Sequence, residues 1–535
     1  MIISSGWPSR IVYRIVTVSD TQFSPPPETP VTPTSTRALA VVALSLCSAG
    51  LAPASPAAAT AALGYDAANK GALHHIGKVV GAHDAFAAGL TGKGVGIALI
   101  DTGVTEVPGL DSGNVYHGPD LSFDSQDPEL TYKDGYGHGT HMASIMVGRD
   151  APGHPMTYTD TSKFFGIAPD ATLVSIKVGA QDGAVDVSQV IAAINWVVEN
   201  RNAGPDPIRV INLSYGTDSE QDYAVDPLVH AAENAWRKGI TVVAAAGNDG
   251  RDTMLLANPA LSPNLLAVGA EDTAGTVDVG DDVVPEFASR GTDKRHVDVV
   301  APGVSVLGLR VPGGYADELH PEARVGDRFA RASGTSQAAA VVSAQVALLQ
   351  QKHSGRLTPD QVKTQFMSYA HGLDLSKKYS GRGLTKVNDA VAKPALKGKA
   401  SGLPFSTGTG SLEAARGSSH VSDGGGGLQG EFDIFGRPWD AYASAAAADG
   451  EDIWQGRTWR GATWTGDGWN GRTWRGADWS ADSFTAGTWS GRTWRDDAWA
   501  GRTWREGTWT GRTWRDGAWA GRTWRLADLA SDGWR

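Results

Sequence analysis

The sequence predicts an α/β protein with a doubly wound, mostly parallel sheet. From about residue 75 to residue 393, short apolar runs alternate with segments whose apolar residues recur at helical spacing. The runs are almost unbroken, whereas a strand with one face in water alternates apolar and polar residues. Helices are therefore expected on both faces of the sheet. The hydrophobic fraction, 41% of 535 residues, suffices for a large core and excludes a globally disordered chain.

Four apolar runs are predicted to be strands. Each is short and rich in the aliphatic residues that favour buried strands. Helical segments lie between them, so the strands are expected to run parallel. The four predicted strands are Val95–Ile100, Leu173–Val178, Ile208–Leu213 and Ile240–Ala245.

Two of the intervening segments are predicted helices, Val187–Glu199 and Pro227–Lys238. The first has apolar residues at helical spacing, and Pro227 is tolerated in the first turn of the second. Two further helices are expected to begin at His138 and at Ser336, where the helical pattern continues to Gln350. In such folds, functional side chains gather at the carboxyl ends of the strands.

Residues 31–59 are predicted to be a secretory signal peptide. Residues 38–52 form an apolar run that is preceded by Arg37 and followed by small residues up to Ala59. That order is typical of a signal peptide, and the run is too short to span a bilayer. A buried helix is the alternative interpretation.

Residues 1–30 are not needed by this signal, which suggests initiation at Val31 after a non-native lead. Residues 60–74 form a short segment before the first domain. The single cysteine, Cys47, lies inside the signal, so the mature chain would have neither an intramolecular disulfide nor a cysteine-based zinc site. No other long apolar run is present. The product is therefore expected to be secreted and extracellular, without a transmembrane anchor.

The C-terminal part of the chain has a different composition. Residues 394–450 are rich in Gly, Ala and Ser and are predicted to be a linker, with an apolar patch at Phe432–Phe435 that docks elsewhere. Residues 454–535 form a repeat in which 15 of the 19 Trp residues of the chain are spaced by multiples of five. This tail has 13 Arg, nine acidic residues and no Lys, hence a net charge of +4, within a chain of net charge −11.

The five-residue period constrains the fold of the tail. Five residues of α-helix rotate roughly 140° beyond a full turn and a flat strand has period two, so neither keeps the Trp residues on one face. A chain that turns a corner every five residues keeps the Trp residues on one face, as in a pentapeptide β-solenoid. A disordered tail is the alternative. Either form would contact cell-wall glycans by stacking, or anionic surfaces through arginine. The weak positive charge disfavours nucleic acid.

Four motifs carry the residues that acyl transfer needs. The hydroxyl of Ser336 in SGTSQAAA needs a base to take its proton, and His138 in GYGHGTHMA would serve. The resulting imidazolium needs a carboxylate, which Asp101 in ALIDTGV would provide at the end of a strand. The oxyanion needs fixed donors. The amide of Asn248 in AAAGND and the backbone N–H of Ser336 would supply them.

In their order and context, D-T-G-V, H-G-T-H, A-A-G-N and G-T-S-x-A-A resemble the motifs of subtilisin-like serine proteases (subtilases). The resemblance covers residues 75–393. It implies a subtilisin-like fold and a secreted serine endopeptidase with an Asp101–His138–Ser336 triad and an Asn248 oxyanion hole. His138 is preferred to His141, because the first histidine of H-G-T-H is the base in the family. No cofactor is required for this chemistry.

The resemblance also implies a site for an extended peptide or protein substrate. The segment NLSYG resembles the family strand that pairs with the substrate backbone. The wall of the main specificity pocket would be formed by the segment that precedes Asn248. The implied binding residues are Ser214, Tyr215 and Gly216 on the strand, and Ala245, Ala246 and Gly247 in the pocket wall.

Related enzymes hold structural calcium, and the acidic clusters Asp120–Asp127 and Asp281–Asp282 are the candidates here, although such runs are more often solvated surface. Two departures from the family pattern are Gln337 and Ala340, which stand where Met and Pro are usual. A third is the short segment after the signal, which leaves no room for the long folding propeptide of many secreted subtilisins.

The linker and tail, including Gly408–Gly417, look like those of some actinobacterial secreted subtilases, which assigns them no function. The alternative function is a surface- or polymer-binding protein that uses the tail and has only narrow processing activity. A further hypothesis is that the tail assists or inhibits the protease in place of a propeptide.

Overall fold

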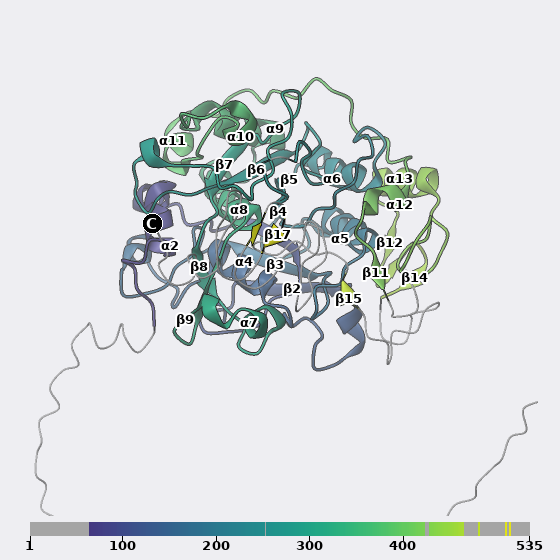
Figure 1. Ribbon diagram of the computed structural model, residues 1–535, viewed down its shortest axis with the longest axis horizontal. Helices are drawn as coiled ribbons and strands as arrows, with labels where there is room; N and C mark the ends of the chain where they lie inside the picture. The colour runs from purple at the N-terminus through teal and green to yellow at the C-terminus, as the bar shows by residue number, and fades with distance from the viewer. Residues whose placement is uncertain are drawn as a thin grey trace, which may run out of the picture. The chain divides into compact units, whose positions relative to one another are not determined.

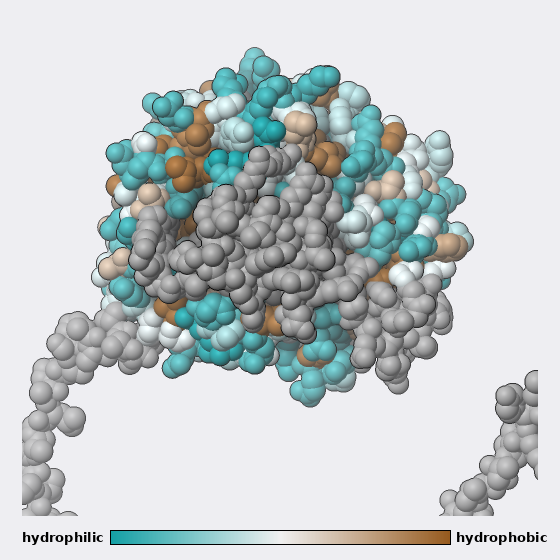
Figure 2. Space-filling model, viewed as in Figure 1, coloured by the Kyte–Doolittle hydropathy of each residue, from teal (hydrophilic) through white to brown (hydrophobic). Residues whose placement is uncertain are grey.

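The computed structural model describes residues 64–464, apart from residue 252 and residues 423–426, and three two-residue strands further along. The predicted lead and signal peptide, 1–59, and most of the tail lie outside the described residues. Within the described part, no helix has both the length and the hydropathy that crossing a membrane requires. On the described surface visible in Figure 2, hydrophilic residues predominate and hydrophobic residues lie singly or in small groups.

A seven-stranded parallel sheet has the order β2-β3-β1-β4-β5-β6-β7 (Figure 1). Every residue of β1, β3, β5 and β6 is buried. Because neighbouring residues of a strand face opposite sides, both faces of the sheet are covered, as predicted. The four predicted strands are correct to within one residue at each end. The strands are β1 (Gly96–Asp101), β2 (Val115–Asp120), β3 (Thr172–Lys177), β4 (Ile208–Leu213), β5 (Thr241–Ala245), β6 (Leu266–Glu271) and β7 (Val299–Pro302).

Two pairs of helices accompany the sheet. Helix α4 (His138–Val147) packs on α8 (Thr335–Lys352), and α5 (Val187–Asn200) packs on α6 (Pro227–Arg237). Helix α8 contacts β4, β5 and β6 and is buried from its first residue to Gln350. The predicted helices therefore form where the apolar spacing placed them.

Side-chain caps explain where α5 and α6 begin. Asp186 accepts a hydrogen bond from the backbone N–H of Ser188 at 2.9 Å, and the side chain of Gln189 accepts one from the N–H of Asp186 at 2.7 Å. This reciprocal arrangement is a capping box. At α6, Asp226 accepts from two N–H groups of the first turn, at 2.9 and 3.1 Å, ahead of Pro227.

Smaller elements surround this core. An antiparallel sheet has the order β8-β10-β9, and short 3₁₀ helices lie in loops. The strands are β8 (Val306–Leu309), β9 (Arg324–Val325) and β10 (Phe329–Ala332). The helices are α2 (Leu73–Val79), α3 (Ala82–Ala87), α7 (Tyr315–Leu319), α9 (Pro359–Tyr369), α10 (Lys377–Ser380) and α11 (Val387–Ala392), with η1 (Phe123–Gln126), η2 (Pro155–Thr159), η3 (Val279–Asp281) and η4 (Pro321–Ala323).

The segment after α11 differs from the linker expected from its composition. Helices α12 (Leu412–Arg416) and α13 (Ala441–Gly450) form there and pack against α5 and α6, as Figure 1 shows. Ile434 and Phe435, from the predicted docking patch, are buried in the same apolar cluster as the sheet. Small residues made the segment resemble a linker, whereas in α13 they let the helix approach α6 closely. Strand β11 (Val421–Ser422) also lies in this segment.

The first Trp repeats form an antiparallel ladder of strands β12 (Trp454–Gln455), β13 (Thr458–Trp459) and β14 (Ala462–Thr463). The chain reverses between consecutive Trp residues, because Trp454 pairs with Trp459 and Trp459 with Ala462. The predicted corner between Trp residues is present here, but the pairing is antiparallel and differs from the coils of a solenoid. Strands β16 (Trp509–Thr510) and β17 (Thr513–Trp514) repeat this register, and β15 (Ser480–Ala481) pairs with β11.

Candidate active site

The predicted triad residues lie at the ends of three elements. Asp101 is the last residue of β1, His138 the first of α4, and Ser336 lies in the first turn of α8. All three side chains are buried. The carboxyl ends of parallel strands lie at one edge of the sheet, and α4, which begins with His138, packs on α8, which carries Ser336.

Asp101 and His138 form a buried pair. The distance from His138 Nδ1 to Asp101 Oδ1 is 2.6 Å, and the two side chains are 3% and 2% exposed. The backbone N–H of Thr102 donates to the same carboxylate oxygen at 2.8 Å, which fixes its direction. A carboxylate at Nδ1 favours the tautomer whose Nε2 accepts a proton.

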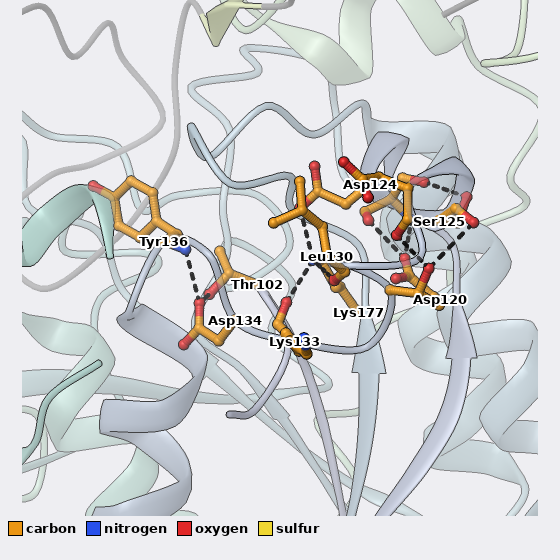
Figure 3. Close-up of polar contacts among 12 residues, drawn as sticks. Thr102, Asp120, Asp124, Ser125, Leu130, Lys133, Asp134, Tyr136 and Lys177 are labelled. Carbon is orange, nitrogen blue, oxygen red and sulfur yellow. Dashed lines mark hydrogen bonds and ion pairs between the residues drawn. The ribbon is translucent and has the colours of Figure 1, made fainter. Parts of the chain in front are cut away.

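Asp134, which the motif analysis missed, ties these two elements together (Figure 3). It accepts hydrogen bonds from Thr102 Oγ1 at 2.8 Å and from the backbone N–H groups of Tyr136, Gly137 and Thr140 at 3.1, 2.6 and 2.7 Å. One carboxylate thus holds both the residue after Asp101 and the start of the helix that begins with the predicted base. An aspartate four residues before a histidine that begins a helix was a signal available in the sequence.

The glycine in H-G-T-H allows close contact between the two elements. A Cβ atom at Gly139 would collide with the carbonyl oxygen of Gly103. The N–H of Gly139 also donates to Thr102 Oγ1 at 2.9 Å. The first turn of α4 therefore rests directly on the backbone that follows Asp101.

Ser336 faces the end of β4. Its hydroxyl donates to the carbonyl of Ser214 at 3.4 Å, and the Ser214 hydroxyl donates to the carbonyl of Ser336 at 3.2 Å. The backbone N–H of Ser336 lies in the first turn of an 18-residue helix, where N–H groups have no partner within the helix. The positive end of the helix dipole is thus next to the hydroxyl.

Asn248 is oriented by the residue before Ser336. Its side-chain oxygen accepts from the backbone N–H of Thr335 at 2.9 Å and from Thr335 Oγ1 at 3.0 Å. The Thr335 hydroxyl receives the N–H of Gly247 at 3.1 Å. Since the amide oxygen accepts both bonds, the amide N–H₂ is the donor end of this side chain.

His141 has a different environment from His138. It is fully enclosed in the protein, and burial together with the neighbouring His138 lowers its pKa to about 3. It therefore stays neutral, whereas a carboxylate contact is present for His138. This difference supports the preference for His138 as the base.

The predicted binding residues follow β4 and begin at the last residue of β5. Ser214 contacts Ser336 directly, as described, and Tyr215 has a buried side chain. At Gly216, a Cβ atom would come within 2.7 Å of the Cβ atom of Ala257. Ala245, Ala246 and Gly247 continue from β5 toward Asn248, and all are buried. Both predicted segments thus lie beside the serine.

In the first predicted calcium region, a lysine ammonium lies among the acidic groups (Figure 3). Lys177 Nζ donates to Asp124 Oδ2 at 2.7 Å and to the carbonyls of Leu130 and Lys133 at 3.0 and 2.5 Å. Asp120 accepts hydrogen bonds from its own loop. The Asp124 carboxylate and the two carbonyl oxygen atoms thus already have a cation, the ammonium group of Lys177.

The second predicted calcium region has partly buried carboxyl groups. Asp281 accepts from Thr276 Oγ1 at 2.8 Å. Burial and the neighbouring Asp281 raise the pKa of Asp282 to about 7, and burial and Asp282 raise the pKa of Glu271. Among the described residues, no three His, Cys, Asp or Glu side chains form a group that could hold a metal ion. Structural calcium stays a prediction.

Known proteins are similar to the part of the chain that contains these residues. The sequence model of the subtilase family matches residues 92–410. Serine protease AprX of Bacillus subtilis (strain 168) is 37% identical over 283 residues, which are 51% of this chain and 60% of AprX. Subtilisin BL of Lederbergia lenta is 30% identical over 303 residues, 57% of this chain and 93% of that protein. The match to AprX thus covers less than two thirds of that relative.

Proposed function

The chain belongs to the subtilase family, and from this premise we propose that it is a serine endopeptidase that cleaves peptide bonds through an acyl-enzyme. The observation that carries the proposal is the buried His138–Asp101 contact of 2.6 Å, on a helix, α4, that packs on the helix whose first turn holds Ser336. Ordered in this way, the groups suit proton transfer and nucleophilic attack.

In the proposed reaction, Ser336 Oγ attacks the scissile carbonyl carbon while His138 Nε2 takes the hydroxyl proton. Asp101 stabilises the imidazolium that forms. The oxyanion of the tetrahedral intermediate accepts hydrogen bonds from the Asn248 amide and from the Ser336 backbone N–H. His138 then gives its proton to the leaving amine, and water repeats the sequence to release the acid and restore the serine.

The proposed substrate is an extended peptide segment that pairs with the backbone of Ser214–Gly216, with its main side chain against Ala245–Gly247. The predicted signal peptide supports action outside the cell. Among the relatives, the minor extracellular protease Epr of Bacillus subtilis (strain 168) is 31% identical over 268 residues. The likeness of the C-terminal region to actinobacterial secreted subtilases stays a prediction.

The test is Ser336→Ala, which should abolish both peptide hydrolysis and labelling by a fluorophosphonate. Ser343→Ala is a matched control, because Ser343 is another buried serine of α8 and donates to Asn212 Oδ1 at 2.9 Å. It should keep labelling. Labelling that survives in Ser336→Ala would contradict the assignment of the nucleophile.

We keep a second function for the tail, that of binding glycans or anionic surfaces, because of its spaced Trp and Arg residues. The truncation that tests it should end after residue 464, since residues 394–464 pack against the protease domain. If the full chain and the truncated chain bind cell-wall material and anionic vesicles equally, the tail has no such function.

A further inference from the structure

A segment of 13 residues, 406–418, which we call the C-terminal strap, lies beside the chain that follows the predicted substrate edge. The strap runs antiparallel to residues 217–226. At one end the N–H groups of Thr407 and Gly410 donate to the carbonyls of Ala224 and Val225 at 2.8 and 2.7 Å. At the other end Ser418 donates from its backbone N–H to Asp218 at 2.7 Å.

One buried arginine anchors the strap. Arg416 donates from Nε to Asp186 Oδ2 at 2.6 Å, and both side chains are fully enclosed. Its other N–H groups reach Glu413 at 3.0 Å and the carbonyls of Gly430 and Phe432 at 2.8 and 2.5 Å. Since Asp186 also caps α5, the strap is fastened to a helix of the central fold. Arg416 lies beyond the residues that the family sequence model matches.

Ala415, next to Arg416 in the sequence, connects the anchor to Thr217, which is next to the predicted substrate edge. The carbonyl of Ala415 accepts a hydrogen bond from Thr217 Oγ1 at 2.7 Å, and this bond is buried. Thr217 directly follows Gly216, and its backbone exchanges two hydrogen bonds with Asn258, at 3.1 and 2.9 Å. Thr217 is therefore held on one side by the core and on the other by the strap.

Tyr215 gives a second connection. Its side chain is buried, and its hydroxyl has no hydrogen-bond partner among the described groups. Burial raises the pKa of this phenol, Asp186 raises it further, and Arg416 opposes them. The side chain of a predicted substrate-pairing residue thus interacts electrostatically with both members of the anchoring ion pair.

We propose that the strap is a positioning element of the protease: through Arg416 and the Ala415–Thr217 contact it sets the backbone of Ser214–Gly216 for pairing with extended substrates. The inference rests on the proposed endopeptidase function and deepens it. It predicts a specific kinetic signature, because the strap contacts neither Ser336 nor His138 among the described interactions. Substrates that extend along the edge should depend on the strap, whereas substrates that occupy only the pocket next to the serine should not.

The decisive variant is Thr217→Val in the full-length protein, which removes the hydroxyl and keeps the shape. We expect KM for a tetrapeptide amide substrate to rise about tenfold, the equivalent of one buried hydrogen bond, with kcat nearly unchanged. The rate for a single-residue ester, normalised to fluorophosphonate-titrated sites, should stay at the wild-type value. Thr217→Ser keeps the hydroxyl and should restore KM.

Thr407→Val is the matched control, since Thr407 donates from its side chain to Ala224 at 3.2 Å in the strap but far along the chain from the edge. This variant should change neither KM for the tetrapeptide amide nor the rate for the ester. Arg416→Met should show the same selective loss as Thr217→Val, and more strongly, in whatever fraction folds. If Arg416→Met does not fold, Thr217→Val decides.

Two results would overturn the proposal. One is a parallel loss for both substrates in Thr217→Val, which would indicate a purely structural role. The other is an equal KM for Thr217→Val and Thr407→Val. Failure of the endopeptidase function itself is distinguishable, because the wild-type protein would then neither cleave the substrates nor react with the fluorophosphonate.

Discussion

Replacing Arg416 with methionine should destabilise the protein strongly, because the buried Asp186 carboxylate would lose its counter-ion. Both members of the Arg416–Asp186 pair have 0% exposed side chains. Removing one partner of such a pair costs about 3–5 kcal/mol, since the remaining charge stays buried without compensation. In a domain of this size that free energy lowers the melting temperature by roughly 4–7 °C.

The loss of stability in Arg416→Met should depend on pH. Burial raises the pKa of Asp186, but Arg416, with hydrogen bonds from Ser188, outweighs it and lowers the pKa below its usual range. The depressed pKa contributes stability above the ordinary aspartate pKa of about 4, and this stability is lost as the pH falls through the folded-state value. In Arg416→Met, burial favours the protonated acid, which needs no cation. The difference between wild type and variant should therefore be large at neutral pH and shrink toward acid.

The assay is urea unfolding at several pH values in a Ser336→Ala background, which prevents self-digestion. Lys238→Met is the control, because Lys238 pairs with Glu451 at 2.5 Å with both side chains 29% exposed. A partly exposed pair should contribute only about 1 kcal/mol or less. A cost below about 1 kcal/mol for Arg416→Met, or one that does not change with pH, would refute the reasoning.

Three further outcomes are expected. Asp134→Asn should lower kcat on the order of 100-fold with little change in KM, because it loosens the contact between the ends of β1 and α4; an unchanged kcat in steady-state assays would contradict this. Asn248→Ala should reduce kcat by about 10²–10³, measured on the same ester, while a loss confined to KM would argue against an oxyanion role. Glu271→Gln combined with Asp282→Asn should flatten the pH dependence of stability. Their raised pKa values, about 7 for Asp282, make the folded state lose stability as the pH rises from about 4 through 7, so urea unfolding at pH 5 and pH 9 should differ less in the variant than in wild type.

Much of the fold could be predicted because its signals are local. Each central strand is a continuous apolar run, and α5 carries both helical spacing and a capping box within one short stretch. The candidate residues Asp101, His138 and Ser336 could be named for the same reason, since each lies in a short motif at the end of a predicted element. Their placement at element ends follows from the parallel sheet.

The contacts that sequence reasoning missed join distant parts of the chain. Nothing near Arg416 indicates a partner 230 residues away, and the Gly- and Ser-rich sequence around it suggested a linker. Asp134 was missed although it is local, because it belongs to none of the four motifs. For the Trp repeat, the period predicted turns but not pairing direction, since a corner every five residues is compatible with both parallel coils and antiparallel strands.

The separation between Asp186 and Arg416 also has a meaning in time. A ribosome or an export channel delivers the chain from its N-terminus, so all three predicted triad residues emerge before the arginine that completes the anchor. A nascent chain can therefore contain its predicted nucleophile and base before Asp186 has its counter-ion, Arg416. If the strap positions the substrate edge, the ability to cut long peptides is acquired later than the triad itself, once Arg416 has emerged and paired with Asp186.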